Sequence, residues 1–307
     1  ATKVDVEAQP WAVALAQLDS GAGLDLVTAN KSGNSISIAM GNNNGKVGTG
    51  ESPKSATLGA PQPTGLTIGD MNKDGFLDII ACNEQVNNVA ILKNDGAGTF
   101  TLGAEISVGS KPQGIAGFDF NGDMIFDTVS ANAGGNNASL LYGAAGTMFN
   151  AATPLSDPGV STPSPSAIAV ADLNKDGKPD IVMANQMNGG VTVFLSNAAG
   201  TAFTLKGSYS AGATLPAGIT IGDFVGDSNL DVAVSLNGTG YISILPGDGT
   251  GALGPFVRYS AMEAATDAPI GLANADFNAD GVPDIVAALN GNTKVVVILN
   301  TNKTPAV

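Results

Sequence analysis

Asp172-Leu-Asn174-Lys-Asp176-Gly177-Lys178-Pro-Asp180 is the stretch on which the interpretation of this chain depends. Carboxylate or amide oxygens occupy positions 1, 3, 5 and 9 of these nine residues, and Lys178 at position 7 offers a backbone carbonyl. Alternating oxygens suit calcium, a hard cation that takes about six to eight oxygen ligands. A glycine at position 6 permits the positive φ that turns the chain around an ion. The stretch therefore predicts a calcium loop.

The residues after this loop argue against a helical calcium motif. An EF-hand has a Glu at position 12 and then a helix, whereas this chain has Met183 at position 12 and continues as the apolar run Ile-Val-Met-Ala-Asn. The dockerin-type loop, whose ligands also end at position 12, fails for the same reason. The run is typical of a strand, so we expect the loop to join two strands.

The loop belongs to a unit that occurs six times in the 307 residues. A proline stands seven residues before the first position of every copy, and the units start near residues 10, 63, 112, 165, 216 and 269. Each unit has an alternating strand, the acidic loop, a second strand, a polar turn and a third strand, and the first five units continue with a Gly/Asn turn and a fourth strand. Four strands in a unit of this length predict a propeller blade. The sequence predicts an all-β, six-bladed β-propeller of four-stranded antiparallel blades, as a single domain over residues 1–307.

The two ends of the chain suggest how the ring closes. The sixth unit stops after its third strand, at residues 294–300, while residues 1–9 precede the first proline as a fourth strand would. Pairing the first and last segments leaves few open sheet edges. We therefore expect residues 1–9 to complete the sixth blade.

The six loops differ in their ligand sets. Loops two, four and six are complete, loop three has Met124 where the others have glycine and must bear its positive φ, and loop five has Val225 at position 3. The first loop, with Gln17, Asp19 and Gly21, lacks two of three carboxylates, and we expect it to be metal-free. We predict three to five calcium ions, held by Asp70, Asn72, Asp74, Phe76, Asp78, Asp119, Asn121, Asp123, Ile125, Asp127, Asp172, Asn174, Asp176, Lys178, Asp180, Asp223, Asp227, Asn229, Asp231, Asp276, Asn278, Asp280, Val282 and Asp284.

Composition excludes several classes of function. The chain has no histidine and one cysteine, Cys82, which excludes disulfides, Cys/His zinc sites and Ser-His-Asp triads. Cys82 lies in an apolar strand, where we expect a buried and inert thiol. The net charge is −14 and there is no basic cluster or long apolar run. We therefore do not expect the protein to bind nucleic acid or to insert into a membrane. The six loops hold 17 of the 27 acidic residues, which makes the acidity mainly local.

The loops, their flanking strands and the Asn-Asp-Gly-x-Gly-x-Phe turn at residues 94–100 resemble the FG-GAP or VCBS repeat family. This family includes the calcium-loop propellers of integrin α-subunit heads and many exported microbial proteins. The resemblance covers essentially the whole chain, although the family often has seven blades. It implies that the loops between first and second strands hold calcium on one face and that the opposite face binds partners. It also implies a secreted or cell-surface protein.

Carboxylate clusters permit a catalytic interpretation, but a loop whose oxygens converge on one cation leaves none for proton transfer. We therefore expect a non-catalytic, exported binding or adhesion module, stabilised by calcium, that recognises protein. A carbohydrate-binding lectin is the alternative, although one Trp and four Tyr are few aromatic residues for a lectin. A structural surface or filament subunit is a third possibility. A polysaccharide lyase comes last, because Arg258 is the single arginine.

Candidate ligand contacts lie on the face opposite the loops. Asn83, Asn132 and Asn185 end second strands before polar turns, where amides can bond sugar hydroxyls or peptide backbone, or can simply form turns. Trp11, the only tryptophan, follows the first repeat proline. Its ring can stack on a sugar at the mouth of the propeller axis or pack over the central channel.

Overall fold

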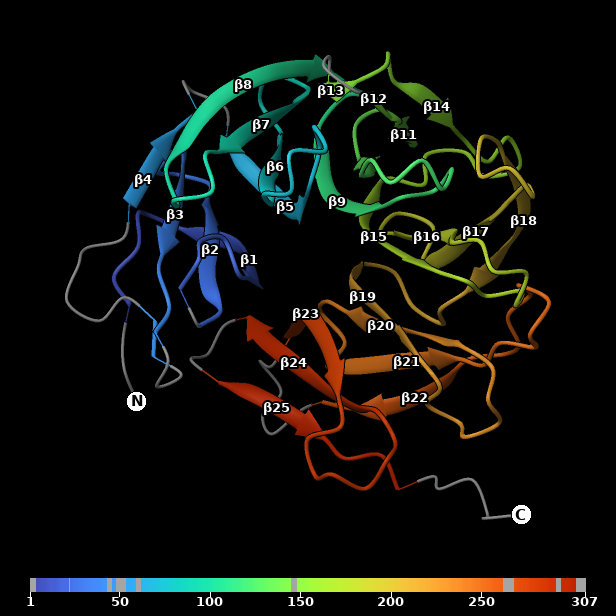
Figure 1. Ribbon diagram of the computed structural model, residues 1–307. Helices are drawn as coiled ribbons and strands as arrows, with labels where there is room; N and C mark the ends of the chain where they lie inside the picture. Colours follow the sequence, from blue (N-terminus) through green and yellow to red (C-terminus); the bar gives the residue numbers. More distant parts are fainter. Residues whose placement is uncertain are drawn as a thin grey trace. The chain divides into compact units, whose positions relative to one another are not determined.

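The computed structural model describes residues 4–21, 23–42, 46–47, 54–58, 62–144, 148–261, 268–290 and 294–301. The chain is a six-bladed, all-β propeller of antiparallel sheets, and the residues in these ranges form no helix (Figure 1). Accordingly, no described helix could span a membrane. The chain divides into two compact units, residues 1–156 and 157–307, with three blades each. A single domain over residues 1–307 therefore stays a prediction.

Residues 1–156 contain blades one to three, each a sheet of four strands in meander order. Blade one has β1 (Pro10–Ala16), β2 (Asp25–Asn30), β3 (Ser35–Ala39) and β4 (Lys54–Thr57). Blade two has β5 (Pro63–Gly69), β6 (Asp78–Asn83), β7 (Asn88–Asn94) and β8 (Phe100–Ser107). Blade three has β9 (Pro112–Phe118), β10 (Asp127–Asn132), β11 (Asn137–Leu141) and β14 (Thr153–Leu155), with the short hairpin β12 (Gly143–Ala144) and β13 (Met148–Phe149).

Residues 157–307 contain blades four to six. Blade four has β15 (Pro165–Ala171), β16 (Asp180–Asn185), β17 (Gly190–Ser196) and β18 (Phe203–Ser210). Blade five has β19 (Pro216–Gly222), β20 (Asp231–Leu236), β21 (Tyr241–Leu245) and β22 (Val257–Ser260). Blade six has β23 (Ala268–Ala275), β24 (Asp284–Asn290) and β25 (Val295–Ile298).

The repeated residues set the strand boundaries. Five first strands begin at a repeat proline and the sixth begins one residue earlier, at Ala268, which confirms the predicted unit starts. Proline is tolerated at the first residue of a strand because the ladder does not need its missing N–H there. All six second strands begin at the last Asp of an acidic loop.

The core lies between neighbouring blades of each unit. Second strands such as β6 are buried along their whole length, because a blade presents apolar residues to the blade on either side. Between blades one and two, Val27 and Ile36 pack with Ile79, and between blades four and five, Val193 packs with Val232. The fourth strands are exposed or half-buried and contain no fully buried residue, because they form the outer edge of each blade; in β18 the two classes alternate.

Blade six departs from the expected closure. Its sheet has three strands among the described residues, and residues 4–9 form no strand. The predicted fourth strand is therefore not formed by residues 4–9, and residues 1–3 lie outside the described residues. The physical reason lies in the first blade. The carbonyls of Gln9 and Ala8 accept hydrogen bonds from the N–H groups of Lys31 (2.9 Å) and Gly33 (3.0 Å), in the turn after β2.

Candidate metal loops and the opposite face

The acidic loop of blade four is held in shape by its own side chains. The Asp172 carboxylate accepts the N–H groups of Asp176 (3.1 Å) and Gly177 (2.8 Å), and Asn174 Oδ1 also accepts that of Asp176 (3.1 Å). Asp176 Oδ1 accepts the N–H of Lys178 (2.8 Å). These are turns in which a side chain imitates a backbone acceptor. The loop therefore has a defined conformation that brings the oxygens of positions 1, 3 and 5 together.

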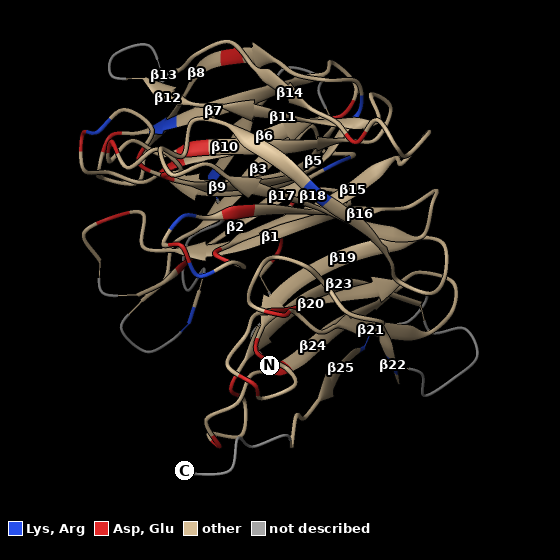
Figure 2. Ribbon diagram, turned by 90° about the vertical axis from the view of Figure 1, so that its right-hand side faces the viewer, with Lys and Arg blue, Asp and Glu red and all other residues tan. Residues whose placement is uncertain are grey.

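The other loops repeat this arrangement. Equivalent bonds hold Asp70, Asn72, Asp74 and Phe76 in loop two, Asp119, Asn121, Asp123 and Ile125 in loop three, and Asp276, Asn278, Asp280 and Val282 in loop six. In loop five, Asp223 and Asp227 accept loop N–H groups, and Asn229 donates its N–H to Asp227 (2.8 Å). The strands carry few acidic residues and the loops carry many (Figure 2). Each loop thus gathers its own predicted ligands.

Position 6 has the left-handed backbone that the sequence predicts. Its φ is 88° at Gly75, 82° at Gly177 and 91° at Gly281. Met124 and Ser228 hold the same conformation, at 65° and 69°. A Cβ built at any of those three glycines meets nothing within 4 Å, so the requirement for glycine comes from the backbone alone.

The Asp at position 9 faces inward. Asp180 is fully buried, its Oδ2 accepts the N–H of Leu173 (2.9 Å) and its Oδ1 accepts the N–H of Ser196 (3.0 Å). The carboxylate therefore ties the start of the acidic loop to the end of the third strand. Asp25, Asp78, Asp127, Asp231 and Asp284 make the same two bonds in the other blades.

Loop one shows that the two backbone hydrogen bonds of the position 9 Asp do not depend on a complete metal ligand set. Asp25 bonds the N–H groups of Leu18 (2.6 Å) and Gly41 (2.7 Å), although its loop lacks the predicted ligand set. The spacing of the loop residues predicts a calcium ligand at position 9 and gives no sign of this structural role. The presence of Asp25 in a loop that lacks the other two carboxylates of the pattern is the sequence feature that distinguishes the two roles.

Burial changes the acidity of four of these carboxyls. Burial raises the pKa of Asp78, Asp180 and Asp231, and it raises the pKa of Asp127 to about 6. The two backbone N–H groups bonded to Asp127 lower its pKa and partly offset burial, and the nearby carboxylates of Asp123 and Asp119 raise it further.

The chemistry of the loops fits a hard cation, since all the gathered side-chain ligands are oxygens. Within the described ranges, however, no three acidic side chains form a metal-holding group. The oxygens of positions 1 and 5 bond to loop amides and those of position 9 bond inward, so an ion would have to replace some of these bonds. Calcium binding at the predicted ligands stays a prediction.

The asparagines predicted to contact a ligand are inside the protein. Asn83, Asn132 and Asn185 are fully buried. Their amides donate to side chains near the start of the third strand, at Asn88 (2.8 Å), Asn137 (2.9 Å) and Thr192 (2.8 Å). They close the turn between second and third strands, so the structure contradicts their assignment to a ligand.

Trp11 lies on the surface of the first unit. It is 55% exposed, and the ammonium of Lys31 lies 4.6 Å from the centroid of its ring. Lys31 also pairs with Glu84 at 2.5 Å, which joins the turns of blades one and two. The exposed indole therefore forms a cluster with one positive and one negative side chain, both half-buried. The place of Trp11 at the propeller axis stays a prediction.

A backbone feature that the repeat spacing does not predict recurs just before the repeat prolines of both units. Residues before the repeat prolines have positive φ, between 49° and 66°, although a residue before proline normally prefers an extended conformation. They are Gln9, Gln62, Lys111, Ser164 and Leu215. Each carbonyl accepts an N–H from the turn after a second strand, as in the bond from Glu84 to Gln62 (3.2 Å). This repeated bond fixes these turns in place.

Cys82 has the properties expected of an inert thiol. It is fully buried beside the hydroxyl of Thr64 (3.5 Å), and burial raises its pKa to about 11. Such a thiol carries little thiolate at neutral pH, so it is a poor nucleophile.

The fold and the repeated acidic loops define a repeat propeller. A family model described as FG-GAP-like repeat matches residues 23–81, 70–127, 119–183 and 172–234, which together cover more than half of the chain. The chain belongs to the FG-GAP-like repeat family. No curated protein sequence matches it.

Solved structures of similar fold have varied functions. BBS1N in complex with ARL6DN is 12% identical, with a TM-score of 0.65, and the match covers 97% of this chain and 81% of that one. An Agrocybe aegerita lectin that recognises non-reducing terminal N-acetylglucosamine is 18% identical, with a TM-score of 0.62 and coverage of 95% and 77%. A putative 6-phosphogluconolactonase from Bacteroides fragilis is 18% identical, with a TM-score of 0.60 and coverage of 78% and 69%. At these identities the likeness concerns the fold alone.

Proposed function

We propose that this protein is a non-catalytic binding or adhesion module that recognises a protein partner through the face opposite the acidic loops. The observation that carries the proposal is the cluster of Trp11, Lys31 and Glu84. Exposed tryptophan flanked by charged side chains is typical of the few residues that supply most of the affinity in a protein interface.

The fixed turns around this cluster support the same proposal. Lys31 and Glu84 each follow a second strand, and their N–H groups bond to the carbonyls of Gln9 and Gln62. A surface that is ordered before binding loses less conformational entropy when a partner docks. The turns therefore present the cluster in a binding-ready arrangement.

The hydrogen bonds of the asparagine side chains favour a protein partner over a carbohydrate. Asn83, Asn132 and Asn185 are buried, and the Oδ1 atoms of Asn34 and Asn87 accept the N–H groups of Gln62 (3.1 Å) and Lys111 (2.7 Å). These amides form turns and are not turned toward a sugar. A lectin remains the alternative, because Trp11 is exposed and one propeller of similar fold is a lectin.

A catalytic role has little chemical support. The chain has no histidine and one arginine, and its single thiol is buried. The likeness to a putative lactonase extends to the fold at 18% identity. A structural surface or filament subunit is a third candidate, which a concentration series in mass photometry would detect as ordered oligomers.

We further propose that three to five Ca²⁺ ions stabilise loops two to six and that the protein is secreted or at the cell surface. Calcium loops of the extracellular type bind the ion with Kd of about 10⁻⁴–10⁻³ M, so they are suited to the calcium level outside cells. Loops two, four and six match the calcium pattern fully, loops three and five depart from it at one or two positions, and loop one lacks two carboxylates. These differences support three to five calcium ions rather than six.

The binding proposal is tested on arrays of extracellular proteins and of glycans, using Trp11→Ala and Lys31→Glu variants. Both variants are expected to weaken binding to a protein partner by at least tenfold. Leu24→Ala is the matched control, because Leu24 is 57% exposed but lies in an acidic loop of the same unit. Binding to glycans alone, or binding that Leu24→Ala weakens as much as Trp11→Ala, would contradict the proposal.

A further inference from the structure

In each unit, one lysine side chain connects two neighbouring acidic loops. Lys73, at position 4 of loop two, donates from its ammonium to the backbone carbonyl of Asp123 in loop three (3.1 Å). Lys175, at position 4 of loop four, donates to Asn229 Oδ1 in loop five (2.7 Å). The two acceptors stand at positions 5 and 7 of the receiving loops. Each ammonium therefore bonds a residue that is a predicted calcium ligand.

The glycines of positions 4 and 6 show which loops receive a lysine. Both positions have positive φ in loops two to six, and each of these loops has glycine at only one of them. Loops two and four have lysine at position 4 and glycine at position 6, whereas loops three and five have glycine at position 4 and Met124 or Ser228 at position 6. The two loops that receive an ammonium are thus the two that lack the glycine of position 6.

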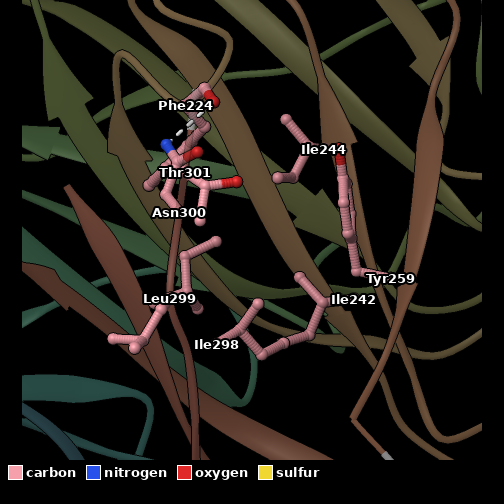
Figure 3. A pocket seen from close by; sticks show the side chains of 9 residues that line it. Phe224, Ile242, Ile244, Tyr259, Ile298, Leu299, Asn300 and Thr301 are labelled. Atoms are coloured by element: carbon pink, nitrogen blue, oxygen red, sulfur yellow. Dashed lines mark hydrogen bonds between the residues drawn. The ribbon is translucent and has the colours of Figure 1, made fainter. Parts of the chain in front are cut away.

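The core fixes the inner part of the receiving loops. Phe120 and Phe224, at position 2 of loops three and five, are buried. Phe224 lines an apolar cavity of about 140 Å³ between blades five and six, and its carbonyl accepts the side-chain amide of Asn300 (2.9 Å; Figure 3). The lysines contact the outer part of the loops, where Asp123 is exposed and Asn229 is half-buried. The ammonium therefore acts on the part of the loop that does not belong to the core.

The charges of the receiving loops give the ammonium a role. Loops three and five each have three carboxylates and no cationic side chain of their own: Asp119, Asp123 and Asp127, and Asp223, Asp227 and Asp231. Carboxylates at this spacing repel one another when no cation is present, and an ammonium beside them reduces the repulsion. The same ammonium would repel a calcium ion, which carries two positive charges. The lysine therefore favours the calcium-free loop over the calcium-bound loop.

We propose that Lys73 and Lys175 are built-in cations for loops three and five and lower the calcium affinity of these two loops. The inference rests on the proposed calcium binding and adds an order to it: loops two, four and six take up the ion first, and loops three and five bind it more weakly. Loop six receives no such side chain from the loop before it, because position 4 of loop five is Gly226. Loop two follows loop one, whose position 4 is the uncharged Ser20.

Calorimetric titration of the full chain with calcium tests the inference through the double variant Lys73→Met/Lys175→Met, which keeps long side chains and removes their charge. The wild type is expected to show a tight and a weak class of sites. In the double variant the Kd of the weak class is expected to fall about 3- to 10-fold, because the ammonium no longer repels the ion. The difference is expected to shrink in high salt, since the screening length falls from about 10 Å at 0.1 M to about 3 Å at 1 M.

Lys93→Met/Lys111→Met is the matched control, because it removes the same charge from two exposed lysines outside the acidic loops. Its calcium affinities are expected to equal those of the wild type. If the control tightens calcium binding as much as Lys73→Met/Lys175→Met does, the effect comes from net charge and the inference is overturned.

The same titrations separate failure of the inference from failure of the calcium proposal. Equal Kd values in the wild type and Lys73→Met/Lys175→Met would overturn the inference and leave the calcium proposal standing. Absence of calcium binding in all three proteins would contradict both. Weak sites that appear only in Lys73→Met/Lys175→Met would support the inference and limit the natural protein to the tight sites.

Urea denaturation distinguishes this role from a purely structural one. In chelator, Lys73→Met/Lys175→Met is expected to unfold at a lower urea concentration than the wild type, because two bonds between loops are lost. Adding calcium is expected to raise the midpoint of the double variant by more than it raises that of the wild type. Equal increases would mean that the lysines only hold neighbouring loops together, and the inference would be wrong.

Discussion

Met124 holds a left-handed backbone conformation that its side chain does not favour. It is 72% exposed, so the side chain contributes little burial in return. Replacing Met124 by Gly is expected to raise the free energy of unfolding by about 0.5–1 kcal/mol, because glycine adopts positive φ without steric cost. Urea denaturation measures the change.

Gly177→Ala is the matched reverse change, because a Cβ at Gly177 meets no neighbour and only the φ of 82° opposes it. It is expected to destabilise by a similar amount. If both variants unfold at the same urea concentration as the wild type, position 6 is not strained and the argument from φ fails.

The raised pKa of Asp127 in the third loop predicts that the free energy of unfolding depends on pH. Its pKa of about 6 in the folded protein lies above the ordinary 3.8, so the folded state binds this proton more tightly than the unfolded state. In the presence of chelator, stability is therefore expected to rise as the pH falls through 6, and this gain is complete below 3.8. Urea denaturation at pH 7.5 and pH 5 measures the effect.

Asp127→Asn is the control for that titration, since its amide does not take up a proton in this range. The variant is expected to gain less stability than the wild type between pH 7.5 and pH 5, while Asp78, Asp180 and Asp231 still contribute. An identical pH dependence in both proteins would contradict the raised pKa of Asp127.

At the scale of the element, the buried Asp at position 9 joins each acidic loop to its third strand. Asp25→Ala leaves the N–H groups of Leu18 and Gly41 without their acceptor. The expected loss is about 2–4 kcal/mol, from two buried donors. The loss is expected to be the same with calcium and with chelator, because loop one lacks the ligand set.

Asp19→Ala, in the same loop, is the comparison for Asp25→Ala. Among the described residues, half-buried Asp19 accepts the nearby N–H of Gly21 (2.7 Å), a local bond within the loop, so a change below about 1 kcal/mol is expected. Equal losses of stability from both substitutions would show that the inward bonds of Asp25 stabilise the protein no more than the local bond of Asp19 does.

For the whole molecule, calcium binding is expected to shift the unfolding equilibrium. A site with Kd of about 10⁻⁴–10⁻³ M gains roughly 0.4–1.4 kcal/mol at about 1 mM calcium, so five sites give roughly 2–7 kcal/mol. This is comparable with the net stability of a typical domain. The Tm in scanning calorimetry is therefore expected to be higher in calcium than in chelator.

Asp176→Ala removes one loop's position 5 carboxylate and is expected to reduce that calcium-dependent shift while leaving a shift from the remaining loops. A transition that calcium leaves unchanged in the wild type would contradict the metal assignment of all the loops.

Local chemistry along the chain was sufficient to place the starts of the first and second strands of every blade. Proline and Asp mark the starts of strands through local chemistry, a missing donor and a side chain that bonds nearby backbone, and the six copies make this local information redundant. For the same reason the positive φ at Met124 followed from its place in the loop. Local spacing was sufficient because each loop is closed by residues within its own nine positions.

Only the tertiary structure decided which polar side chains face solvent. Asn83 and Asp78 look like ligands in the sequence, yet both are buried. Asp78 accepts the backbone N–H of Asn94, 16 residues away, and Asn83 donates to the side chain of Asn88 at the start of the third strand. The cavity at blade six likewise depends on contacts between two blades. Spacing along the chain does not encode the direction of a side chain, because that direction is set by packing against blades that are distant in sequence.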